Sequence, residues 1–117
     1  MNKPLFAITL FLLGTAPAHA TGGFVCRTAG SRPIEVSLGF GHVPGSPLIL
    51  TRLTDNGRQV PVQSAQWWLD KSELRLVLVS PNAMREELVI RARGNRHFYD
   101  GSAWRNGRQQ WIRCRGD

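Results

Sequence analysis

The chain has 117 residues, 42% of them hydrophobic, which suits one globular domain and leaves too little length for two of ordinary size. Fifteen Lys and Arg residues stand against eight Asp and Glu residues, a formal net charge of +7. This charge favours anionic partners, while the hydrophobic content argues against a disordered chain.

Residues 1–20 have the pattern of a secretory signal peptide. Lys3 precedes an apolar run from Leu5 to Leu13, and Ala18-His19-Ala20 supplies the small residues of a cleavage site. A bilayer span needs about 20 apolar residues, so neither this run nor any later one predicts a transmembrane helix. We expect cleavage after Ala20, leaving a single β domain over residues 21–117 in the periplasm or outside the cell.

Two cysteines, Cys26 and Cys114, lie near the two ends of the expected domain. An even number of cysteines in an exported chain is typical of a disulfide, and the sequence has no Cys-x-x-Cys redox motif. We therefore predict a Cys26–Cys114 bridge that joins the first strand to the last.

Hydrophobic and polar residues alternate along most of the chain, which predicts β-strands rather than helices. The clearest alternations cover 34–40, 74–79 and 88–93, and shorter candidates cover 48–53, 59–63, 66–70, 96–99 and 109–115. The 74–79 segment is apolar on both faces, so we expect it to be central in a sheet or covered by the segment that follows it.

Turn signals separate these strands. Asn56-Gly57 and Asn106-Gly107 predict type I′ hairpin turns, which need positive φ at both central residues. Gly94-Asn95 and Asp100-Gly101 are weaker turn candidates, and in the segment from Ser80 to Glu87 we expect at most one or two helical turns. About eight short strands with such turns predict an all-β domain, a small antiparallel barrel or sandwich.

The sequence offers no convincing catalytic or metal-binding set. His97, Asp100 and Ser102 are close in sequence, but a catalytic triad depends on spatial geometry, and Asp100-Gly101 is expected to form a turn. His42 and His97, with two cysteines in a disulfide, do not supply three or four zinc ligands. We predict no enzyme activity, no metal and no cofactor.

The positions of the acidic residues also argue against an enzyme active site. Glu35, Glu86 and Glu87 are expected at outward or strand-end positions, unlike the facing carboxylates of a glycosidase. We interpret Glu86-Glu87 as a solvated charge pair beside Arg85.

Strand alternation gives several basic and aromatic residues an outward face. Cys114 must point inward to meet Cys26, so the residues next to Cys114 in the strand point outward. Ile90 also points inward, so the residues next to Ile90 point outward as well. If these strands share a sheet, its outer surface holds the predicted ligand-binding residues, which are Arg91, Arg93, Trp111, Arg113 and Arg115. Trp68 is the outward member of Trp67-Trp68, and it either stacks on a ligand or lies under a loop.

Clustered guanidinium groups beside an aromatic ring suit phosphate, sulfate or carboxylate groups. The favoured interpretation is an exported, non-enzymatic binding or accessory protein of the bacterial cell envelope. Its anionic partner would be a polysaccharide, lipopolysaccharide or peptidoglycan. The alternatives are an envelope protein as the partner and, less favoured, a small hydrolase.

The arginine surplus can also arise without any ligand. It can come from a coding bias towards arginine, or it can belong to a solvated face whose arginines pair with Glu86, Glu87 or Asp100. Nucleic acid fits the charge but not the expected location, and the sequence does not define an oligomeric state.

In layout the chain resembles the small periplasmic inhibitors of C-type lysozyme, exported β-barrels of about this length with a cysteine near each end of the domain. That family's inserted loop reads roughly Ser-x-Ser-Gly-x-x-Tyr, whereas the nearest stretch here, Ser64-Ala65-Gln66-Trp67, lacks the Gly and the Tyr. The resemblance implies a protein partner, but those lysozymes are themselves basic and would repel a cationic surface. No site residue is carried over from that family.

Overall fold

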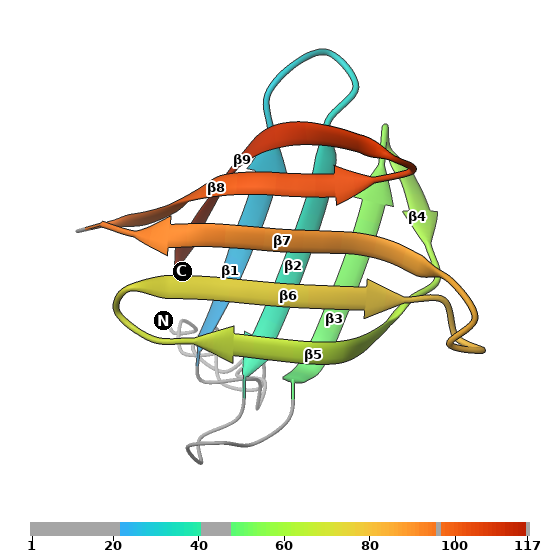
Figure 1. Ribbon diagram of the computed structural model, residues 1–117, viewed down its shortest axis with the longest axis horizontal. Coiled ribbons are helices and arrows are strands. Elements are labelled where there is room, and N and C mark those ends of the chain that lie inside the picture. The colour runs from blue at the N-terminus through green and yellow to red at the C-terminus, as the bar shows by residue number, and fades with distance from the viewer. Residues whose placement is uncertain (1–21, 41–47, 96, 117) are drawn as a thin grey trace, which may run out of the picture.

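The computed structural model describes residues 22–40, 48–95 and 97–116, in which every regular element is a β-strand (Figure 1). The nine strands are β1 Gly22–Thr28, β2 Ile34–Phe40, β3 Leu48–Asp55, β4 Arg58–Val60, β5 Gln63–Leu69, β6 Glu73–Val79, β7 Glu86–Gly94, β8 Phe98–Arg105 and β9 Arg108–Gly116. This confirms the all-β prediction, with nine strands where about eight were expected. The described residues contain no helix that could span a membrane, and the predicted signal peptide lies outside them.

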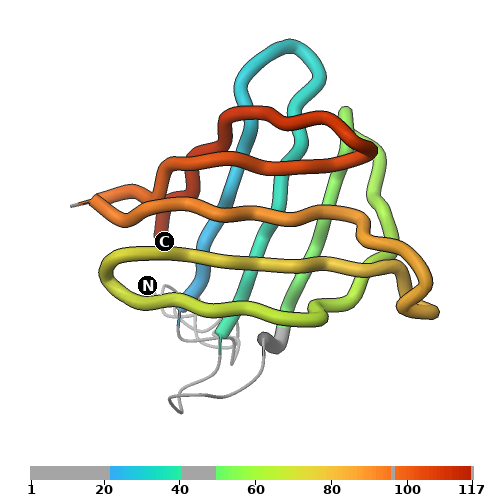
Figure 2. The backbone as a smooth tube through the Cα atoms, viewed as in Figure 1, coloured from blue at the N-terminus to red at the C-terminus, as the bar shows by residue number. Residues whose placement is uncertain are grey.

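All neighbouring strands are antiparallel, in the order β4-β3-β2-β1-β9-β8-β7-β6-β5. Strands β1–β4 form one meander and β5–β9 a second, and the pairing of β9 with β1 joins the two into one sheet. The sheet curls so that β1–β3 cross behind β5–β8 (Figure 1), and Figure 2 follows the same path along the backbone. β5 contacts β3, but no ladder joins them in the described ranges, so the sheet is a half-barrel.

The core fills the space between the two halves of the curled sheet. Inward residues alternate along each strand, and register is fixed because a one-residue slip would expose them. The largest fully buried side chains are Val36, Leu53, Leu74, Leu76, Leu78, Leu88, Ile90 and Ile112. Both meanders contribute to this cluster, so burial of apolar surface holds the curl closed.

The predicted disulfide is confirmed. Cys26 of β1 lies directly opposite Cys114 of β9, and both are fully buried and bonded to each other. They are 88 residues apart in sequence, and the chain-entropy model assigns a bridge of such length about 4 to 5 kcal/mol. The bond therefore fixes the pairing at which the two meanders meet.

The two Asn-Gly turns are confirmed, but the Asp100-Gly101 turn is wrong. Asn56-Gly57 and Asn106-Gly107 have positive φ at both residues, 55° and 83° in the first and 51° and 76° in the second. Asp100 and Gly101 instead lie inside β8, where a Cβ on Gly101 would collide with the backbone carbonyl of Arg91 on β7. The glycine is thus explained by close strand packing.

Other boundaries also differ from those predicted. The expected strand over 59–63 is split, because β4 ends at Val60, before Pro61, and β5 begins at Gln63. The strand expected over 96–99 runs instead over Phe98–Arg105, because the turn before it forms at Asn95, whose Oδ1 accepts hydrogen bonds from the amides of His97 and Phe98. The turn between β7 and β8 therefore lies at Asn95, about five residues before Asp100.

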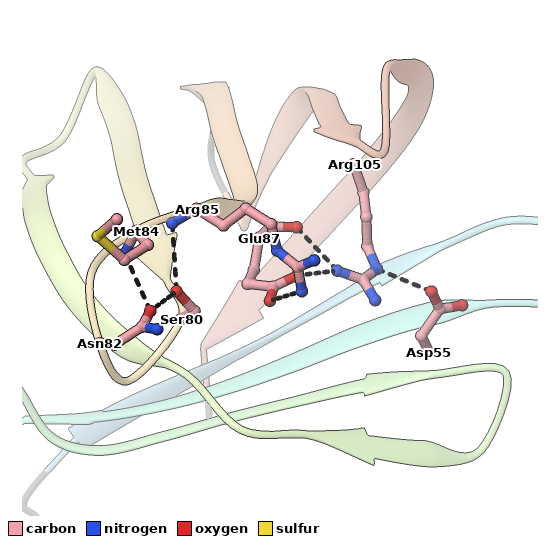
Figure 3. Close-up of polar contacts among 7 residues, drawn as sticks. All are labelled: Asp55, Ser80, Asn82, Met84, Arg85, Glu87 and Arg105. Carbon is pink, nitrogen blue, oxygen red and sulfur yellow. Dashed lines mark hydrogen bonds and ion pairs between the residues drawn. The ribbon is translucent and has the colours of Figure 1, made fainter.

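The segment after β6 is a loop rather than a short helix. Ser80 donates its hydroxyl proton to Asn82 Oδ1 at 2.7 Å, and that same oxygen accepts the amide of Met84 at 3.0 Å (Figure 3). Ala83 has φ 61°, in the left-handed region, which helical backbone does not adopt. β7 then begins at Glu86, so the two glutamates belong to a strand.

Glu87 is buried, which corrects its interpretation as half of a solvated pair. Arg105 Nη1 donates to Glu87 Oε1 at 2.9 Å and Arg105 Nε donates to Asp55 Oδ2 at 2.7 Å, while Arg85 holds the other Glu87 oxygen at 3.0 Å (Figure 3). The hydrogen bond from Arg85 is the largest effect on the pKa of Glu87 and lowers it, against the opposing effect of burial. Through Arg105 this polar cluster ties β3 of one meander to β7 and β8 of the other.

Candidate functional site

The outer face of β5–β9 is organised in three neighbouring rows that run across the strands. Directly opposed residues on adjacent strands point to the same face, so the register defines each row. The charge-paired row is Glu73, Arg93, Asp100 and Arg113; the cationic row is Trp68, Arg75, Arg91, Ser102 and Trp111; the apolar row is Gln66, Val77, Val89, Trp104 and Gln109.

The charge-paired row carries two acids and two bases. Asp100 accepts hydrogen bonds from Arg113 Nε at 2.6 Å and from Nη2 at 3.0 Å. The Arg113 guanidinium holds the pKa of Asp100 below its usual value, chiefly through these bonds. Arg93 lies in register between Glu73 and Asp100. Arg113 is therefore engaged by Asp100, whereas the ion pair of Glu73 is with Arg75 and not with Arg93.

The cationic row contains no acid. Arg75 lies directly opposite Arg91, and both side chains are exposed. Arg75 reaches along its own strand to Glu73 at 3.0 Å, whereas Arg91 makes no ion pair with any residue that the structure describes. Like charges that face each other across two strands destabilise a sheet. Glu73 therefore partly offsets the charge of Arg75, while the charge of Arg91 has no ion-pair partner among the described residues.

Trp68 is held in place at one end of the cationic row. Its indole Nε1–H donates to Asp70 Oδ2 at 2.8 Å, and the other Asp70 oxygen accepts the amides of Ser72 and Glu73. These bonds, with that from Trp68 the largest, lower the pKa of Asp70 to about 2. The Trp68 side chain is 56% exposed, so it does not lie under a loop. The polar edge of the ring is fixed while the ring remains open to solvent.

The apolar row forms the floor of two open grooves. One, of about 360 Å³, is lined by Trp68, Arg75, Val77, Val89 and Arg91 among others, and the second, of about 520 Å³, extends from Val89 and Arg91 to Trp104. Small valines between two large indoles create the hollow. The second apolar face of β6 therefore lines an open groove, and the expectation that β6 is central or covered is wrong: β6 is next to the edge strand β5.

The predicted residues do not form one cluster. Arg91 and Trp68 belong to the grooves above, whereas Arg113 and Arg115 line a separate hollow of about 610 Å³ with Arg27 of β1. Trp111 lies between the two, since it lines that hollow and is also the β9 end of the cationic row. All of them lie outward as the strand alternation requires. They do not form one group, because β8 lies between β7 and β9 in the sheet.

The charges of that separate hollow are largely satisfied by the protein. Arg27 pairs with Glu35 at 3.0 Å and Arg113 with Asp100. The guanidinium carbons of Arg113 and Arg115 lie 4.3 and 5.7 Å from the centre of the Phe98 ring, a cation–π arrangement. This hollow is the weaker candidate for an anion.

Sequence reasoning missed Arg75, Trp104 and the two valines of the floor. The outward position of Arg75 follows from the alternation of Leu74 and Leu76, but only the register shows that it faces Arg91. Trp104 was missed because β8 was placed too early and ended at a turn that does not form. A longer β8 would have put Trp104 on the same face as Ser102.

Two of the three candidate catalytic residues, Asp100 and Ser102, are engaged in hydrogen bonds with other side chains. Asp100 is bound by Arg113, and Ser102 Oγ accepts a hydrogen bond from Gln109 Nε2 at 2.9 Å. His97 is exposed, and in the described residues no hydrogen bond joins its side chain to Asp100 or Ser102. The described part of the chain also holds no group of three His, Cys, Asp or Glu residues placed to bind a metal, while His42 lies outside it.

Comparison with protein-family models, with curated proteins and with solved structures found no significant match to this chain. Its functional interpretation therefore depends on the chemistry of the outer face.

Proposed function

We propose that this protein is a non-enzymatic binding protein of the bacterial cell envelope that engages an anionic polymer along the outer face of β5–β9. The observation that carries the proposal is the cationic row, which has a tryptophan at each end, two opposed arginines and no acid. Neighbouring strands lie about 4.8 Å apart, so the row extends roughly 20 Å, enough for several units of a polymer.

The chemistry of the row suits a polymer with acidic groups and flat, partly apolar rings. A guanidinium group binds carboxylate, sulfate or phosphate through two parallel hydrogen bonds. An anion placed between Arg75 and Arg91 would also relieve their mutual repulsion. Trp68 and Trp111 offer indole surfaces on either side, and Trp68 loses little freedom on binding because Asp70 already orients it.

The proposed location rests on two features. The Cys26–Cys114 disulfide fits an oxidising compartment such as the periplasm or the medium. The signal-peptide pattern of residues 1–20 points to export. Among anionic polymers, this location favours a polysaccharide, lipopolysaccharide or peptidoglycan over nucleic acid.

The test compares two pairs of arginines by the affinity of the purified protein for polygalacturonate and dextran sulfate, with neutral dextran as a blank. The variant Arg75→Ser/Arg91→Ser removes two charges from the cationic row. The control Arg52→Ser/Arg58→Ser removes two exposed arginines from β3 and β4 and changes net charge equally.

We expect the row variant to lose about tenfold or more in affinity and the control about twofold, because one strong charge-assisted contact accounts for about tenfold. Affinity of the native protein should fall as salt rises. Equal losses in the two variants would overturn the proposal, since net charge alone would then explain binding. A co-purifying protein whose complex survives high salt would instead support a protein partner.

A further inference from the structure

The outer face changes from cationic to apolar over one step along the strands. On β6, Val77 follows Arg75 by two residues on the same face, and on β7, Val89 precedes Arg91 in the same way. Two residues of a strand extend about 7 Å. A ligand bound at Arg75 and Arg91 therefore has an apolar floor within about 7 Å of its anionic group.

This floor is hollowed and flanked by aromatic rings. The two grooves adjoin at Val89 and Arg91, with Trp68 beside one groove and Trp104 beside the other. Trp68 is 56% exposed and Trp104 36%, and both valines are half-buried. A hollow lined by valines and indole rings beside a cationic group can take up a short apolar group, because burying each methylene is favourable. The anionic groups of an unsubstituted acidic polysaccharide use the arginines but leave this floor in water.

We propose that the ligand of this face carries an aliphatic chain beside its anionic group, and that the chain lies over Val77 and Val89. The inference rests on the proposed function and narrows it to an acylated anionic glycan, a glycolipid in chemical class. The anionic group sits between Arg75 and Arg91, and the first methylenes of the chain lie in the groove between the Trp68 and Trp104 rings. The occupant is one amphiphile molecule, bound singly.

The experiment titrates the protein with n-alkyl phosphates from ethyl to decyl phosphate, at concentrations below micelle formation, and measures affinity by calorimetry. Each methylene that leaves water for the groove should raise affinity about two- to fourfold until the groove is full. Arg91→Ser should weaken every member of the series by a similar factor. Val77→Ser and Val89→Ser should flatten the dependence on chain length.

Val25→Ser is the matched control, because Val25 is also a half-buried valine but lines the separate hollow beside Arg115. It should leave the chain-length dependence unchanged. Thermal melts of all three valine variants establish that each is folded at the temperature of the titration.

The outcomes separate the inference from the proposed function. Affinity that is independent of chain length, with polyanion binding intact, overturns the inference and leaves the function standing. A chain-length dependence without polyanion binding overturns the function as a polymer-binding protein. Binding to anionic phosphatidylglycerol vesicles with no binding of soluble alkyl phosphates also overturns the inference, since it would show adsorption to a surface.

Discussion

Arg75 of β6 lies directly opposite Arg91 of β7 on the exposed face of the sheet. A like-charged pair in this position costs about 0.2 to 1 kcal/mol of stability. The neighbouring row avoids that cost by alternating acids with bases, whereas the cationic row does not. Such a local loss of stability is expected where an anion binds, because the bound anion removes it.

Replacing Arg91 by Gln should therefore stabilise the free protein. We expect a gain of about 0.5 kcal/mol in the free energy of unfolding, seen as a rise of about 2 to 4 °C in Tm. Arg58→Gln, at an exposed arginine of β4, should leave Tm nearly unchanged. Addition of dextran sulfate should raise the Tm of the native protein more than that of Arg91→Gln. A lower Tm for Arg91→Gln without ligand would contradict this account.

The adjacent residues Trp67 and Trp68 should respond in opposite ways to truncation. Trp67 stacks on Phe40 with ring centres 5.2 Å apart and packs against the core, so Trp67→Ala should lose about 3 kcal/mol of stability. Trp68→Ala and Trp111→Ala remove side chains that are each 56% exposed. These two should keep stability within about 1 kcal/mol and lose about tenfold in polymer affinity, as measured by melts and by titration. A large fall in Tm for Trp111→Ala would show that its ring is structural.

The polar cluster of Asp55, Glu87 and Arg105 should contribute strongly to stability. Arg105 is the only described side chain that joins Asp55 of β3 to Glu87 of β7, and its side chain is 10% exposed. Arg105→Met leaves Asp55 without its partner and Glu87 with Arg85 alone, and should cost about 3 kcal/mol. Arg113→Met breaks an exposed pair with Asp100 and should cost less than about 1 kcal/mol. Urea unfolding of the two variants tests the difference, and similar losses would argue against a tie between the meanders.

The same cluster gives stability a dependence on acid pH. The folded-state pKa of Glu87 is lowered, chiefly by the hydrogen bond from Arg85. Its contribution is therefore complete above the unfolded pKa, near 4.3, and is lost as pH falls through the lower folded value. Glu87→Gln should flatten the fall in Tm between about pH 5 and pH 3, whereas Glu86→Gln, at its exposed neighbour, should not. An unchanged pH profile in Glu87→Gln would refute the assignment.

Loss of the disulfide should lower the stability of the fold without changing the outer face of β5–β9. Cys26→Ser removes a bond between two residues that are 88 apart in sequence, and should lower the free energy of unfolding by at least about 2 kcal/mol. The protein without substitutions, denatured in the absence of reductant, should show no free thiol. One reactive thiol per chain in that assay would argue against the bond.

Local sequence patterns predicted most of the strands, while long-range strand pairing determines which side chains lie next to one another on the outer face. Alternation around Ile90 and Cys114 was enough to place Arg91 and Trp111 outside, and the φ values of Asn106 and Gly107 follow from the turn type. Asp100-Gly101 has a local turn signal, but contact with the Arg91 backbone determines its conformation.

The candidate site depended even more on pairing. No sequence spacing shows that Arg75 faces Arg91, because that follows from the length of the loop between β6 and β7. Burial of Glu87 likewise depends on Arg105, which is 18 residues away. Residues that meet through register or through the curl of the sheet could not be grouped from the sequence alone.

The most direct test of the binding face uses the four tryptophan indole N–H signals in a ¹⁵N-resolved NMR titration with short polygalacturonate chains. We expect shifts for Trp68 and Trp111 and for the amides around Arg75 and Arg91, while the signal of Trp67, stacked on Phe40, stays nearly fixed. Shifts spread evenly over the arginines of the surface, or concentrated on β3 and β4, would contradict the claim that the cationic row binds the polymer.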